Sequence, residues 1–132
     1  MGTRAVVHVD LRPVGYGKDI WIATHLDGNP ENLGKDLRKE IAFQKNEFKR
    51  NFPSIPLDMG SILQKAVARA SALHNIDLMS VDGKGEFPYG DYADYQYEVD
   101  AKTGKVKVRT LQGEWGSSIQ KIGKWKQLSK VI

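Results

Sequence analysis

The segment Tyr92–Leu111 constrains the fold most, because its pattern specifies both a β-hairpin and the register of its strands. Apolar and charged residues alternate in YQYEVD and VKVR, on either side of the short turn AKTG. If Asp100 is paired with Lys105, apolar side chains meet on one face and opposite charges on the other, at about 0.2–1 kcal/mol per pair. A slip by one residue would set charges against tyrosine and valine. The same register pairs Val99 with Val106, Tyr97 with Val108 and Glu98 with Lys107.

Two further strands are predicted over residues 4–12 and 19–27, where β-branched residues recur at every second position. The glycines of the connecting segment RPVGYGKD suit a tight turn, so these strands are expected to form a second hairpin. Ile76–Val81 is a candidate for one more short strand. The glycine-rich stretch after it, DGKGEFPYGDY, has no dinucleotide or P-loop fingerprint and is expected to be a loop.

Helices are predicted over Pro30–Arg50 and Asp58–His74, where apolar residues recur at steps of three and four. The prolines of the intervening NFPSIPL disfavour a helix and separate the two. A third, short helix is expected near the C-terminus, with Ser117 or Ser118 as its N-cap. Its apolar face would consist of Ile119, Ile122, Trp125 and Leu128.

These elements predict a single α+β domain over residues 1–132, an antiparallel sheet built from two hairpins and packed on one face by two or three helices. With 40% hydrophobic residues the chain can form a core. The absence of cysteine excludes disulfides and thiol chemistry. No apolar run reaches the length of a membrane span, and no signal peptide is evident, so a cytoplasmic protein is expected.

The segment His25-Leu-Asp-Gly-Asn-Pro30 stands where a strand gives way to a helix. Asn29 is a favoured N-cap, and Pro30 suits the first helical position. Asp27 and Gly28 are typical turn residues. We therefore interpret this segment as a corner of the backbone, in which His25 alone has no structural role.

A second His-x-Asp pair, His8 and Asp10, lies on the preceding predicted strand. If Val9 pairs with Thr24, His8 lies opposite His25, and the two imidazoles and the carboxylates of Asp10 and Asp27 form one patch. Such a patch could bind a divalent metal or act in acid–base chemistry. If Val9 pairs with Ile22 instead, His8 faces Ala23 and the patch loosens. The sequence leaves both registers open.

Basic residues dominate residues 101–132, whereas acidic residues dominate residues 77–100. Near the C-terminus bases are interleaved with aromatic residues, a pattern that can hold phosphates and stack on nucleobases. The alternative is an amphipathic helix with tryptophans in the core and lysines in solvent. The candidate nucleic-acid-binding residues are Trp115, Lys121, Lys124, Trp125, Lys126 and Lys130.

The segment ATHLDGNPENLGKDL is similar to the His-Trp-Asp-Gly-Tyr-Pro segment of small uncharacterised proteins of phages and prophage-bearing prokaryotes. His25, Asp27, Gly28 and Pro30 match that motif, while Leu26 and Asn29 replace its aromatic residues. The segment YADYQYEVDAKTGKVKV also resembles their distal hairpin. The resemblance implies a small accessory or regulatory protein and carries over no activity.

From these patterns we expect a non-catalytic protein without cofactors that acts by binding, most directly to another protein. The alternatives are a weak nucleic-acid binder that uses the basic C-terminal third, and a metal-dependent hydrolase that uses His8, Asp10, His25 and Asp27. The sequence predicts no membrane association, and it leaves open whether the protein is a monomer or a homodimer.

Overall fold

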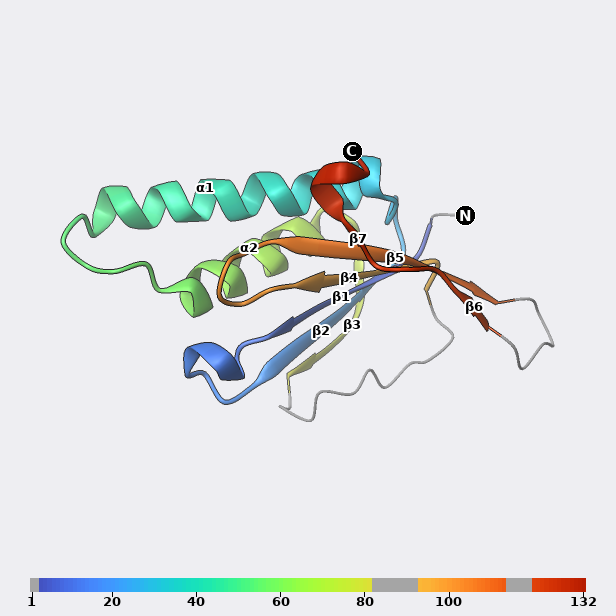
Figure 1. Ribbon diagram of the computed structural model, residues 1–132, viewed down its shortest axis with the longest axis horizontal. Coiled ribbons are helices and arrows are strands. Elements are labelled where there is room, and N and C mark those ends of the chain that lie inside the picture. The colour runs from blue at the N-terminus through green and yellow to red at the C-terminus, as the bar shows by residue number, and fades with distance from the viewer. Residues whose placement is uncertain (1–2, 82–92, 114–119) are drawn as a thin grey trace.

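The computed structural model describes residues 3–81, 93–113 and 120–132, which form a sheet with two α-helices on one face (Figure 1). The strands are β1 (Ala5–Asp10), β2 (Asp19–Thr24), β3 (Ile76–Val81), β4 (Tyr95–Val99), β5 (Val106–Gly113), β6 (Gln120–Ile122) and β7 (Lys126–Gln127). The helices are α1 (Lys35–Asn51) and α2 (Met59–Ala72), with short helical turns η1 (Arg12–Val14), η2 (Pro30–Gly34) and η3 (Leu128–Lys130). Among these residues no helix is long and apolar enough to cross a bilayer.

The strand order is β3-β2-β1-β4-β5-β6, and β7 also pairs with β5. The two predicted hairpins are β1–β2 and β4–β5, and they join through a parallel pairing of β1 with β4. The other pairings between described strands are antiparallel. The predicted α+β class, with helices packed on the sheet, is therefore confirmed.

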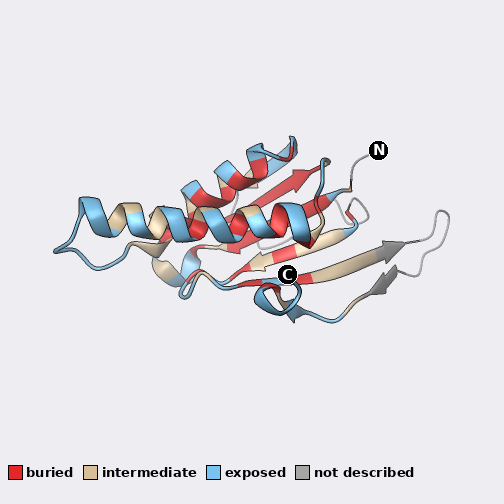
Figure 2. Ribbon diagram, turned by 90° about the horizontal axis from the view of Figure 1, so that it is seen from above, coloured by how far each residue is buried: buried red, intermediate tan, exposed pale blue. Residues whose placement is uncertain are grey.

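The core lies between the sheet and the helices. Alternate residues of β1, such as Val7 and Val9, face α1 and α2 and are fully buried, as are Leu37 of α1 and Leu63 of α2. Figure 2 shows buried and exposed residues alternating along both helices, as their amphipathic sequences require. The predicted apolar stripe of the second helix is thus its buried face.

The β4–β5 hairpin has the predicted register. Val99 pairs with Val106, Tyr97 with Val108 and Glu98 with Lys107, and the Asp100 N–H donates to the Lys105 carbonyl at 2.9 Å. The match follows from the chemistry of the pattern, because every neighbouring register would place charge in the core.

Both registers considered for the β1–β2 hairpin are wrong. Val9 pairs with Ile20, so His8 lies opposite Trp21. The three registers differ by steps of two residues, which leave every side chain on the same face, so alternation cannot distinguish them. The turn decides instead: the Leu11 N–H donates to the Lys18 carbonyl, and the Asp10 carboxylate accepts the Arg12 N–H.

The predicted C-terminal helix is also wrong. The chain instead returns along β5 as β6 and β7, and within residues 120–132 only Leu128–Lys130 are helical. The predicted N-cap, Ser117 or Ser118, lies outside the described residues. Gly123 makes this return possible, because its N–H donates to the Thr110 carbonyl at 2.8 Å and a Cβ there would lie 2.3 Å from Thr110 Oγ1. Pairing with a preformed strand overrides the weak three-residue periodicity, and Gly123 is a poor helix former.

Candidate functional site

The corner at Asp27 and Gly28 is formed by backbone conformation and backbone hydrogen bonds. Asp27 has a φ of 49°, and its carbonyl accepts the Leu33 N–H at 3.2 Å. The Gly28 N–H donates to the Thr3 carbonyl at 3.0 Å, and a Cβ at this position would lie 2.6 Å from Ala5 Cβ. The chain thus turns where it touches the start of β1, which only glycine permits.

Tyr97 of β4 links the corner to the sheet. Its buried hydroxyl donates to the Gly28 carbonyl at 2.7 Å. Burial raises the pKa of Tyr97 well above its ordinary range, so the hydroxyl remains a donor. This tyrosine was placed in the hairpin by the sequence pattern, but its link to the corner spans sixty-nine residues and has no local signal.

The helical segment beyond the corner begins as predicted at Pro30, although its first residues, η2, form a short π-helix that leads into α1. Asn29 occupies the N-cap position without a side-chain hydrogen bond to the helix backbone. Its amide oxygen instead accepts from the Asn32 side chain at 2.9 Å, and its amide nitrogen donates to Glu31. The predicted position of the cap is right, and its predicted bonding differs.

His25 and His74 have separate partners near the same corner. His25, for which the sequence suggested no structural role, has Nδ1 2.5 Å from Asp77 of β3. His74 is buried, with Nδ1 2.8 Å from the Leu26 carbonyl and Nε2 2.7 Å from Asp36. Both histidines therefore join elements around the corner.

His8 lies between two carboxylates on the sheet face opposite the helices. Its Nδ1 is 2.7 Å from Glu98 of β4 and its Nε2 is 3.0 Å from Asp19 of β2. The Trp21 ring stacks on the imidazole at 3.8 Å, and its Nε1–H donates to Asp19 at 3.0 Å. The sequence analysis missed this cluster, because it needs both the true β1–β2 register and the parallel β1–β4 pairing.

Burial disfavours the charged form of His8, but the hydrogen bonds and charges of Glu98 and Asp19 outweigh it and raise the pKa of His8. The chemistry is simple: only the protonated ring can donate from both nitrogens. The imidazole is 7% exposed, so a substrate has little access to it. The cluster holds β1, β2 and β4 together and is a structural site.

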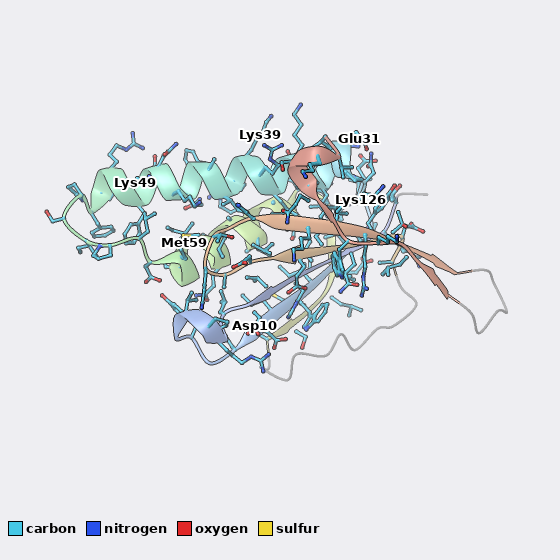
Figure 3. The ribbon with its side chains drawn as sticks, in the orientation of Figure 1. Asp10, Glu31, Lys39, Lys49, Met59 and Lys126 are labelled. Carbon is cyan, nitrogen blue, oxygen red and sulfur yellow. The ribbon has the colours of Figure 1, made fainter. Side chains whose placement is uncertain are left out.

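The structure does not form the candidate metal patch. His8 lies opposite Trp21, whereas His25 follows the end of β2. Asp10 is bound to Arg12, whose hydrogen bonds lower the pKa of that carboxyl. Figure 3 shows Asp10 at the η1 end of the sheet, and Asp27 lies beyond the other end of β2. Among the described residues no three His, Asp or Glu side chains are arranged to hold a metal ion.

The structure brings together only part of the predicted nucleic-acid surface. Lys124, Trp125 and Lys126 lead into and begin β7, and Lys130 is exposed on η3. Trp115 and the Lys121 side chain lie outside the described residues. Arg109 of β5, not predicted, joins the set because its guanidinium lies 4.4 Å from the centre of the Trp125 ring.

Among the strand side chains that the structure describes, those of β3 include the most exposed apolar ones. This strand is the terminal strand in the described order, and its other side is paired with β2. Met79 and Val81 face the helix side, yet they are 53% and 48% exposed, and Leu78 on the opposite face is 37% exposed. Exposed apolar side chains on a strand that has no second partner among the described residues are typical of a binding edge.

Comparison of the chain with protein-family models, with curated proteins and with solved structures gave no match. The resemblance to small phage-type proteins therefore remains a prediction.

Proposed function

We propose that this is a small accessory protein that binds an extended segment of another protein by strand addition at β3. The observation that carries the proposal is the position of β3 at the end of the described sheet order, with apolar side chains exposed on both faces. An added strand would form hydrogen bonds with the outward backbone N–H and C=O groups of β3. Its alternate side chains would supply specificity.

The contrast between the two sheet edges supports this proposal. On the far side, β6 and β7 are short, are separated by residues 123–125 and carry lysines. Short strands, interruptions and lysines are the means by which proteins prevent unwanted strand pairing. In contrast, β3 runs for six residues without lysine, arginine or proline. Within the part of the chain that the structure describes, one edge of the sheet is protected and the other has no partner strand.

The chemistry of the edge defines the partner segment. Asp77 is the charged residue of β3, and its carboxylate is already paired with His25. A complementary strand therefore needs no basic residue, but it needs apolar side chains that cover Met79 and Val81 on one face and Leu78 on the other. A cytoplasmic setting is part of the proposal and rests on the sequence alone.

The test selects binders from a displayed library of random peptides and measures their affinities for three forms of the protein. The double variant Leu78→Lys/Met79→Lys places a charge on each face of β3. The matched control Phe43→Lys/Ile55→Lys introduces the same charge at two exposed apolar residues, one on α1 and one after it. We expect peptides with alternating apolar residues whose affinity falls at least about tenfold, or 1.4 kcal/mol, in the β3 variant only.

Peptides that bind the β3 variant as tightly as the unmodified protein would overturn the proposal. Failure to select any peptide with alternating apolar residues would do the same. Self-association that the β3 variant abolishes would identify a second copy as the strand that β3 accepts.

A further inference from the structure

The opposite edge of the sheet carries a different kind of surface, made by Arg109, Lys124, Trp125 and Lys126 and called here the basic edge. Arg109 is fixed from both sides, because its Nε donates to Gln96 at 2.9 Å and its guanidinium lies over the Trp125 ring. The indole is thereby supported on one face, while 38% of the residue stays exposed. Lysines and short strands already protect this edge, so an exposed tryptophan held by an arginine needs another explanation.

A pocket of about 270 Å³ adjoins the basic edge. Its lining includes Glu31 of η2, Tyr95 of β4, and Arg109, Lys124 and Lys126. Figure 3 shows Glu31 and Lys126 on the two segments that meet near the start of α1. The pocket thus combines cations, an aromatic side chain and an acceptor, in a space smaller than most drug-sized ligand sites.

The charges of this region are unevenly paired. Among the described residues, no salt bridge neutralises Arg109, Lys124 or Lys126. Glu31 is the acid of the pocket, and its carboxylate accepts from Asn29 Nδ2 at 2.9 Å. Hydrogen bonds from its own backbone N–H and from Asn29 lower the pKa of Glu31, so it stays ionised. Glu31 therefore gives the pocket one negative charge and a hydrogen-bond acceptor.

We propose that the basic edge binds single-stranded nucleic acid. The exposed part of Trp125 stacks on a base on the face of the sheet away from the helices, and Lys124 and Lys126 contact the backbone phosphates. The pocket beside Tyr95 lies on the helix side and accepts a further base after the strand has passed round the edge. Aromatic rings next to cations are the usual components of surfaces that bind single strands. They bind strands of different base sequence, because every base has a face that can stack. A base must be unpaired to stack on Trp125, so the proposed contact favours a single strand over a duplex.

The test measures the fluorescence anisotropy of a labelled single-stranded DNA of mixed sequence as the 132-residue protein is added. We expect Trp125→Ala to weaken binding roughly 5- to 150-fold, the range for loss of one stacked base. Trp125→Phe keeps an aromatic ring and should retain most of the affinity. Lys124→Ala/Lys126→Ala should reduce the slope of log affinity against log salt by about 1.4, or 0.7 per lost contact.

The matched control is Lys102→Ala/Lys105→Ala, which removes the same charge from exposed lysines at the other end of the β4–β5 hairpin. It should leave the affinity within about twofold of the starting value, because those lysines lie beyond the basic edge. An equal loss in both lysine variants would reduce the effect to net charge and overturn the proposal. So would absence of binding at low salt, tighter binding to a duplex, or binding that heparin shares and Trp125→Ala leaves unchanged.

Discussion

His8 shows how a buried residue can be specified by its neighbours rather than by its own sequence context. Both ring nitrogens face carboxylate oxygens, of Glu98 and of Asp19, so the protonated ring fits and the neutral ring leaves one acceptor facing another. The His-x-Asp spacing in the strand suggested chemistry, but the partners of His8 come from other strands. The residue joins three strands, and it has a pH dependence that can be measured.

We predict that His8 makes the folded state less stable as the pH rises. Its pKa is raised in the folded protein, so its contribution is fully present below the unfolded value of about 6.5 and is lost as the pH passes through the folded value. Urea unfolding between pH 6 and pH 9 measures this loss as the difference between the unmodified protein and His8→Gln. A difference that stays constant or grows with pH would contradict the raised pKa.

The corner depends on the absence of a side chain at Gly28 and not on the carboxylate of Asp27. Gly28→Ala should lower the free energy of unfolding by about 1–3 kcal/mol, because the added Cβ overlaps Ala5 Cβ and the Thr3 carbonyl. Asp27→Gly is the control in the same corner, and it should stay within about 1 kcal/mol, since glycine adopts positive φ freely. The reverse order of the two losses, measured by urea unfolding, would mean that the Asp27 carboxylate matters more than the bend.

Among the helices and strands, the sequence pattern predicted the features that depend on neighbouring residues in the chain. The β4–β5 register, the two helices and the start of the first helix at Pro30 follow from alternation, periodicity and proline. The β1–β2 register did not, because registers two residues apart bury the same side chains. The C-terminal helix failed because β5 offered a partner for pairing. The parallel β1–β4 contact and the His8 cluster that depends on it have no local signal at all.

The start of α2 is a local feature with a measurable contribution. The Asp58 carboxylate accepts the Ser61 N–H at 3.1 Å as an N-cap and also the Tyr16 hydroxyl, which raises the pKa of Tyr16. Asp58→Ala should therefore lower the free energy of unfolding by about 0.5–2 kcal/mol, while Asp58→Asn retains most of the cap. Equal stability of the alanine and asparagine variants in urea would show that the cap contributes nothing.

At the scale of the whole molecule, the sheet is asymmetric in both layers and edges. The helices cover one face, β3 ends the described sheet with exposed apolar residues, and the basic edge lies on the side of β5 and β7. The two proposed binding surfaces are therefore far apart in strand order, and binding at one leaves the other accessible. Together the two proposals imply that the protein can hold a protein segment and a nucleic acid at the same time.

The proposed strand addition requires the outer side of β3 to be open in the free protein, and amide hydrogen exchange measures this directly. In an antiparallel pair, alternate N–H groups point away from the partner strand. We predict that, along Leu78–Val81, the amides bonded to β2 exchange slowly and the alternate, outward amides exchange fast, whereas β1, paired on both sides, is protected throughout. Uniformly slow exchange along β3 in the free monomer would show that its edge is already covered and would contradict the account.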